Sequence, residues 1–252
     1  KKKKNVQIQR QSSYGAANID AVQIENVTMF VQRAKRKVRE LVYNLNIDQY
    51  QAQDMTLLAE HITDGGITEM AYQQEPDSVL WCVRSDGTLL GFTYARAEEV
   101  VGWHRHVVGG AFSSGNAVVE SVASIPTDAN EDELYVIVKR TINGATRRYV
   151  EYLTLFDYGT DQTDAFYVDS GLTYSGSAAT VITGLDHLEG QSVTILADGS
   201  THPNKTVSSG AITLERSSTK VHVGLGYTSL LQTMRVEAKG EEATSQSKTK
   251  RI

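Results

Sequence analysis

The chain has 252 residues, 40% of them hydrophobic and 22% charged, which is ordinary for a globular protein of one large domain or two smaller ones. Its net charge of −5 excludes a protein that is basic overall and clamps nucleic acid. The single cysteine, Cys82, excludes a disulfide within the chain and a cysteine-based zinc site, and its apolar neighbours predict a buried side chain. No apolar run reaches the roughly 18 residues of a transmembrane helix, so no membrane insertion is expected.

The two ends of the sequence are polar. KKKKNVQIQRQSS at the start lacks the apolar segment of a signal peptide. EEATSQSKTKRI at the end stops in a basic stretch without a terminating pattern. We therefore expect the chain to be part of a longer protein.

Strand patterns dominate residues 1–164. Runs rich in β-branched and aromatic residues are separated by turn formers such as SDG at 85–87 and ING at 142–144. Gln51–Ile62 is ambiguous, because its apolar spacing fits a short helix as well as a strand followed by a turn. The expected strands are Val27–Val31, Val38–Asn44, Ile67–Tyr72, Ser78–Arg84, Leu89–Tyr94, Val100–His106, Val118–Ile125, Leu134–Arg140 and Arg147–Thr154.

These strands form an internal repeat with a period of roughly 50 residues. Residues 29–43 align without a gap on residues 80–94, and a third copy with a longer turn covers 134–152. Each copy consists of an entering strand, a hairpin and, in places, a fourth strand. The period is near that of propeller blades, so we expect residues 1–164 to form a propeller-like array of antiparallel β-sheet blades.

The pattern changes after Asp164. Residues 165–236 contain short strands divided by Gly, Ser, Asp and Asn, which predict a small antiparallel β-barrel or sandwich domain. Residues 237–252 are interpreted as the start of a following segment. The fold class expected for the whole chain is all-β.

The stretch GWHRH looks most like a site for chemistry. In a strand, alternation places Trp103 and Arg105 on one face and His104 and His106 on the other. Two histidines fall short of the three or four ligands of a zinc site. We therefore expect an ordinary strand with a packed Trp103 and no bound metal.

A second candidate for chemistry is GLDHLEG, where Asp186, His187 and Glu189 resemble half of an acid–base site. Residues so close on one turn more often cap that turn than face a substrate from two sides. The serine-rich stretches lack the frame of a nucleophilic serine, and no phosphate-binding loop is present. The sequence predicts no catalytic residue and no cofactor, with a hydrolase using these carboxylates or the histidine pair as an alternative.

The strongest charge feature is the basic run RAKRKVR at 33–39, expected on a hairpin turn. Its interpretation is open among nucleic acid, an acidic neighbouring subunit and solvent, although no interleaved aromatic residues suggest a platform for single strands. The candidates for the basic side of a subunit interface are Arg33, Lys35, Arg36, Lys37 and Arg39. The candidates for the acidic side are Glu131, Asp132 and Glu133, or Asp161–Asp164.

Several stretches carry a family resemblance: residues 6–18, 56–94, 99–106 and 131–153, GLDHLEGQSVTILADG at 184–199, and KVHVGLGYTSLL at 220–231. Together they resemble the tail nozzle, or tail hub, proteins of short-tailed bacteriophages, which are also described as tail tubular protein B-like. The resemblance implies a structural protein of the virion tail, arranged as a ring of six copies that forms the channel for DNA ejection.

The resemblance also implies a set of partners. These are the tail adaptor on the portal side, tail fibre or needle proteins, and double-stranded DNA in transit. It implies no enzyme activity. A net-acidic wall agrees with a conduit, because each phosphate neutralised by Lys or Arg would add affinity for DNA.

A carbohydrate-binding or receptor-contact module of a phage tail is the alternative function. In that case the 165–236 region would present Tyr167, Tyr174 and Tyr227 to a cell-surface sugar. Binding to a glycan array would separate this alternative from a structural conduit.

Overall fold

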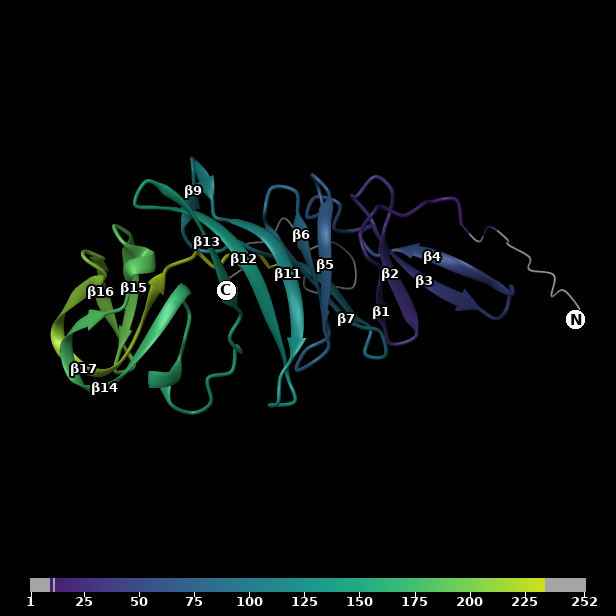
Figure 1. The fold of residues 1–252 in the computed structure, drawn as a ribbon. Coiled ribbons are helices and arrows are strands. Elements are labelled where there is room, and N and C mark those ends of the chain that lie inside the picture. The colour runs from purple at the N-terminus through teal and green to yellow at the C-terminus, as the bar shows by residue number, and fades with distance from the viewer. Residues whose placement is uncertain (1–9, 11, 234–252) are drawn as a thin grey trace, which may run out of the picture.

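The computed structural model describes residue 10 and residues 12–233, and these residues form strands and short 3-10 turns with no α-helix. The strands assemble into four antiparallel sheets of three or four strands and one two-stranded ribbon. Figure 1 shows the larger sheets following one another along an elongated molecule in chain order. The expected all-β class is confirmed. Within the described part of the chain, no helix is long and apolar enough to span a membrane.

The first two sheets are four-stranded meanders in which each strand pairs with the next along the chain. The first sheet consists of β1 (Val22–Ile24), β2 (Val27–Val31), β3 (Val38–Asn44) and β4 (Gln49–Asp54). The second sheet consists of β5 (Ile67–Gln73), β6 (Val79–Arg84), β7 (Leu89–Ala95) and β8 (Val100–His106).

The ambiguous segment 51–62 forms the end of β4 followed by turns, so the strand-and-turn interpretation is the correct one. Helical spacing would have placed Leu58 on the apolar side with Met55 and Ile62. Leu58 is instead 94% exposed, whereas Ile62 is buried and Met55 packs against the core between the first two sheets.

The third sheet consists of β11 (Val118–Pro126), β12 (Asp132–Ile142) and β13 (Ala145–Tyr152). The ribbon of β9 (Ala111–Phe112) and β10 (Gly115–Asn116) precedes it. β12 and β13 pair as far as Ile142 and Ala145, so only two residues form their turn. The longer turn expected in the third copy of the repeat is therefore wrong, because the intervening residues extend the strands.

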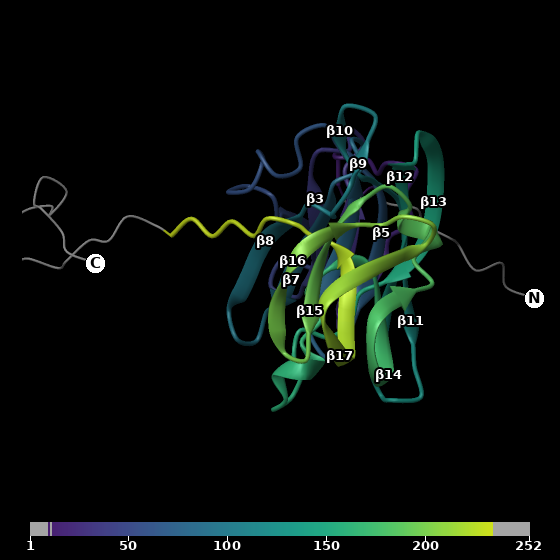
Figure 2. The ribbon, with the colours of Figure 1, turned by 90° about the vertical axis from the view of Figure 1, so that its left-hand side faces the viewer.

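The fourth sheet consists of β14 (Asp169–Thr183), β15 (Ser192–Ala197), β16 (Ser200–Thr206) and β17 (Ala211–Leu225), in the order β14–β17–β15–β16. It is a single sheet that does not close, so of the expected barrel or sandwich the barrel is wrong, and the small antiparallel β unit is confirmed. Register shifts between β14 and β17 bend these two long strands, and one curved sheet can then surround its own core. Figure 2 shows this sheet from its own end of the molecule.

The hairpin of β6 and β7 forms as the SDG sequence predicts. The Gly87 N–H donates to the Arg84 carbonyl at 2.8 Å, and the Arg84 N–H donates to the Thr88 carbonyl at 3.0 Å. Glycine is needed at 87 for two reasons: its φ is +85°, and a Cβ there would lie 2.4 Å from a methyl of Val118. The turn therefore also sets how closely the third sheet approaches.

The second sheet is covered on both faces. Leu80, Cys82 and Phe92 belong to a core shared with the first sheet, whereas Trp81 and Leu89 belong to a core shared with the third. This two-sided burial explains why β6 is a nearly continuous apolar run and not an alternating one. It also explains why Cys82 is fully buried, which raises the pKa of its thiol.

We predict that Phe92→Ala weakens the packing of the first two sheets. The Phe92 ring is fully buried and stacks on Trp103 with ring centroids 4.6 Å apart. Its loss should lower the free energy of unfolding by about 3–5 kcal/mol, measured by chemical denaturation. Phe156→Ala is the matched control, because this ring is 85% exposed and its removal should change stability by less than about 0.5 kcal/mol. Equal effects of the two substitutions would contradict the assignment of Phe92 to the core.

Candidate functional site

The GWHRH stretch is the exposed edge strand β8, and its side chains alternate as predicted. Trp103 stacks on Phe92 in the first core and donates its indole N–H to the Met55 carbonyl at 2.9 Å. His104 and His106 lie on the other face against Trp81, with ring centroids 5.8 and 5.0 Å away. The strand therefore uses one aromatic residue to join the first sheet and two histidines to cover the opposite face.

The two histidines contact each other directly. Nδ1 of His104 lies 2.7 Å from Nε2 of His106, so one ring donates to the other in the neutral pair. Burial lowers the pKa of His104, and burial together with the neighbouring His104 lowers the pKa of His106 to about 4. Gly91 makes room for this pair, because a Cβ there would lie 2.0 Å from Cε1 of His104.

The described residues contain no group of three or more His, Cys, Asp or Glu side chains placed to hold a metal ion. The nearest polar partner of the pair is Thr93, whose hydroxyl lies 3.3 Å from Nε2 of His104. The geometry of the histidine pair is therefore that of a neutral hydrogen-bonded contact packed on Trp81.

The carboxylate of Glu189 holds a turn of the fourth sheet. It accepts the backbone N–H groups of Ser209 at 3.0 Å and Gly210 at 2.9 Å. Asp186 opens a short 3-10 turn and its carboxylate lies against Gly210, where a Cβ would be 2.4 Å from Oδ1. Both carboxylates thus lie beside the turn at Ser209 and Gly210, and the 3-10 turn that carries them has no side-chain cap, so the expected capping of their own turn is not seen.

His187 joins this turn to its surroundings. Its Nε2 lies 2.9 Å from the Ser170 carbonyl, and its own carbonyl accepts the Tyr149 hydroxyl at 3.1 Å. A cleft of about 590 Å³ runs here between the β12–β13 hairpin and the turn at 186–189. Along this cleft, the hydrogen bond of Tyr149 to His187 connects the third and fourth sheets.

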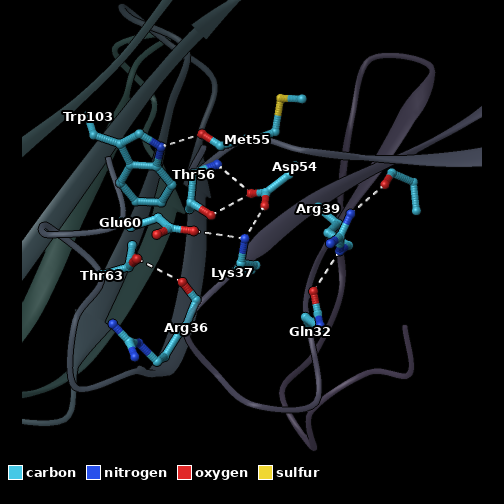
Figure 3. A network of polar contacts seen from close by, with 11 residues as sticks. Gln32, Arg36, Lys37, Arg39, Asp54, Met55, Thr56, Glu60, Thr63 and Trp103 are labelled. Atoms are coloured by element: carbon cyan, nitrogen blue, oxygen red, sulfur yellow. Dashed lines mark hydrogen bonds and ion pairs between the residues drawn. The ribbon is translucent and has the colours of Figure 1, made fainter. Parts of the chain in front are cut away.

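The basic run 33–39 covers the β2–β3 turn and the first residues of β3, and two of its cations, Arg36 and Lys37, form ion pairs within the chain. Figure 3 shows the contacts of Lys37 and Arg39. Lys37 forms ion pairs with Asp54 at 2.7 Å and with Glu60 at 2.9 Å. The hydrogen bond to Asp54 is the main reason that the pKa of Lys37 is raised. Burial would raise the pKa of Asp54, but the hydrogen bonds from Lys37 and Thr56 prevail and lower it.

Arg39 is the most deeply buried cation of the run, with 7% of its surface exposed. It donates to the side chain of Gln32 at 2.7 Å and to the Ala52 carbonyl at 2.8 Å. Its guanidinium lies over the Tyr14 ring, 3.4 Å from the centroid, as a cation–π contact. Arg39 therefore holds the first sheet to the segment that precedes it.

Three basic candidates remain at the surface. Arg36 forms an exposed ion pair with Asp64 at 2.8 Å. Arg33 and Lys35 are exposed, and no side chain among the described residues pairs with either cation. The sequence analysis therefore placed the run on a hairpin turn but did not distinguish its five cations. In the structure, Arg36 and Lys37 form ion pairs and Arg39 is buried. Arg33 and Lys35 remain as exposed cations that pair with no described side chain.

The acidic candidates also divide into residues that bind within the chain and residues without a side-chain partner. Asp132 accepts the backbone N–H groups of Gln74 at 2.7 Å and Glu75 at 3.2 Å, and so ties the third sheet to the second. Glu133 accepts the Tyr135 hydroxyl at 2.7 Å. Glu131 has no side-chain partner among the described residues. In the second acidic segment, Asp161 caps the 3-10 turn η1 (Gln162–Asp164), and Asp164 pairs with Lys220.

Two of the three predicted tyrosines belong to one exposed aromatic patch. Tyr167 is 41% exposed and contacts the rings of Phe156 and Tyr158. Tyr227 is 44% exposed, and burial with the neighbouring Asp169 and Tyr167 raises its pKa. Tyr174 lies elsewhere, packed against the core of the fourth sheet with its hydroxyl on the Ser177 carbonyl.

Sequence reasoning missed Arg140, which is completely buried. Its guanidinium binds both oxygens of Glu151 and donates to the Gly109 carbonyl at 2.8 Å. A signal was present, because Arg140 follows Leu134, Val136 and Val138 on the buried face of β12 in strict alternation. A charged residue at a core position predicts a buried ion pair.

No protein-family model and no curated protein matches this sequence.

We predict that Arg39→Ala destabilises the first sheet. The substitution leaves the Ala52 carbonyl and the Gln32 side chain without a donor and removes the contact with Tyr14. The free energy of unfolding should fall by about 1–3 kcal/mol. Arg33→Ala, in the same run, is the control and should change it by less than about 0.5 kcal/mol. Urea titration of both variants measures the difference, and a larger loss in Arg33→Ala would refute the division of the run.

We predict that the histidine pair makes stability depend on pH. The pKa of His106 falls from 6.5 to about 4 on folding, so the unfolded chain binds this proton first as the pH drops. Stability is therefore full above about pH 6.5 and is lost progressively as the pH falls towards about 4.

Denaturant midpoints at about pH 7 and pH 5 measure this effect, and His106→Gln should reduce the difference between them. His61→Gln, an exposed histidine, is the control. The carboxyls of Asp86 and Glu120, whose pKa values are lowered to about 2 by Arg84 and Arg148 respectively, act mainly at lower pH. If the difference between the denaturant midpoints at the two pH values is unchanged in His106→Gln, the burial of His106 does not govern the pH dependence of stability.

Proposed function

We propose that this chain is a structural subunit of a bacteriophage tail nozzle or hub, located in the virion tail below the portal and adaptor. The observation that carries the proposal is the series of antiparallel sheets stacked face to face, with the second sheet buried on both sides. Such a stack is suited to a scaffold, and polar contacts such as those of Asp132 with the backbone of Gln74 and Glu75 join one sheet to the next. The resemblance of the sequence to nozzle proteins gives the scaffold its context.

In this proposal the first three sheets are blades of a β-propeller. Each blade of a propeller hides its apolar faces against two neighbours, as the second sheet does here. The first and second sheets have the four antiparallel strands of a blade. Further blades, supplied by residues outside this sequence, would be needed to close the propeller within each subunit.

Passage of double-stranded DNA is compatible with the charges of the chain. The net charge is −5, and most cations that lie in strands form ion pairs within the chain, as Lys139 and Arg148 do with Glu120. A cation already paired with a carboxylate has less to gain from a phosphate, so a wall of such residues holds DNA weakly. A conduit requires this property.

The proposal predicts rings of six copies. Mass photometry and electron microscopy of the purified 252-residue chain should detect closed rings of six subunits of 27.7 kDa each. Gold-labelled antibodies against the chain should mark the tails of intact virions. Rings without tail labelling would contradict the proposed location, and a protein that stays monomeric at all concentrations would contradict the ring.

The exposed aromatic patch favours receptor contact as the second candidate function. Aromatic rings at a surface are suited to stacking against sugars, and Tyr167 and Tyr227 provide two of them. Binding on a glycan array that is lost in Tyr167→Ala and kept in Tyr174→Phe would support this function. Tyr174 is the control because it lies outside the patch.

A further inference from the structure

Acidic side chains gather at one end of the strands of the second and third sheets. The β5–β6 and β7–β8 turns lie at the same end of the second sheet, because its strands alternate in direction. Asp132 binds the backbone of Gln74 and Glu75, which brings the β11–β12 turn to that end as well, at the bottom of Figure 1. These three turns carry Glu75, Asp77, Glu98, Glu99, Asp128 and Glu131, which we call the acidic end.

Basic side chains occupy the opposite end. The Ile67 N–H donates to the Lys35 carbonyl at 2.8 Å, and the Ser85 N–H donates to the Gly66 carbonyl at 2.9 Å. These bonds place the β2–β3 turn beside the β6–β7 turn, where β8 also finishes. We call the exposed cations at this end the basic end. They are Arg33, Lys35 and Arg105, together with Arg147 just after the β12–β13 turn.

Ion pairs within the chain neutralise the opposite charges that the turns of the second sheet carry at each end. At the basic end, Asp64 and Asp86 are neutralised by Arg36 and Arg84. At the acidic end, Arg96 is neutralised by the buried Glu40. None of the residues that define the two ends forms an ion pair among the described residues.

We propose that the basic end of one copy of this chain docks against the acidic end of the next copy. The two ends differ in sign and lie at opposite ends of the same strands, so a head-to-tail contact brings unlike charges together. Two like ends would repel, which excludes a symmetric two-fold contact through either end. This contact rests on the proposed ring, to which it assigns the surfaces where neighbouring copies meet.

The contact is electrostatic and therefore sensitive to salt. Exposed charges attract each other over about 8 Å at physiological ionic strength, and this range shortens as salt is added. Complementary charges at the margin of an interface mainly accelerate association. Assembly of the ring should therefore be fastest at low salt and should slow as salt increases.

Charge reversal tests the contact. The basic-end variant carries Arg33→Glu and Arg105→Glu, and the acidic-end variant carries Asp77→Lys and Glu98→Lys; all four side chains are exposed. The control carries Asp20→Lys and Glu215→Lys, exposed acids in the segment before β1 and in the fourth sheet. Circular dichroism and urea titration establish that every variant is folded. Light scattering at low salt follows assembly of each variant, and of the two reversed variants mixed together.

Each reversed variant alone should assemble on the order of tenfold more slowly than the unmodified chain, and the control should not. An equimolar mixture of the two reversed variants should regain the rate, because unlike ends again face each other. Reversed variants that assemble at the normal rate, or a mixture that does not regain this rate, would overturn the proposed contact. Neither result would contradict the proposal that six copies form a ring. An unmodified chain that never assembles would overturn both proposals.

Duplex DNA provides a separate outcome. Retention of DNA by the unmodified chain that is lost in the basic-end variant would assign the basic end to phosphate groups. That result, with normal ring assembly in the same variant, would overturn the docking of copies through this end.

Discussion

The second sheet is buried on both faces, and this burial fixes the positions of the first and third sheets. β6 contributes alternate residues to two cores, with Leu80 and Cys82 facing one neighbour and Trp81 facing the other. An isolated four-stranded sheet with two apolar faces could not be stable in water. Stacking is therefore a requirement of the sequence itself, and the elongated arrangement in Figure 1 follows from it.

Polar contacts supply the register that apolar packing alone does not. The indole of Trp103 on the Met55 carbonyl, Arg84 on the Ile62 carbonyl, and Asp132 on the Gln74 and Glu75 backbone each join elements far apart in sequence. Hydrogen bonds are directional, so such ties fix how one sheet is rotated against the next. Asp132, which the sequence analysis listed as a candidate for a subunit interface, thus holds two sheets of the same chain together.

The parts of the fold that were predictable are those set by local patterns. Alternation and turn residues identified the strands of the hairpins and the two faces of GWHRH, because both depend on neighbours along the chain. The open form of the fourth sheet was not predictable, since bulges between β14 and β17 leave no mark in composition. Pairing of the basic run was also hidden, because Asp54 and Glu60 reach Lys37 only through the fold.

The segregation of charge is a consequence of stacking. When both faces of a sheet are buried, the turns at its two ends are the main surfaces left for unpaired charge. Antiparallel pairing sends alternate turns to opposite ends, so Asp77 and Glu98 share one end while Arg105 reaches the other. A repeat that places acidic residues in alternate turns would thus make one end of a stack of sheets negative and leave the other end for basic residues. Copies with such a direction associate head to tail more readily than in any symmetric pairing of like ends.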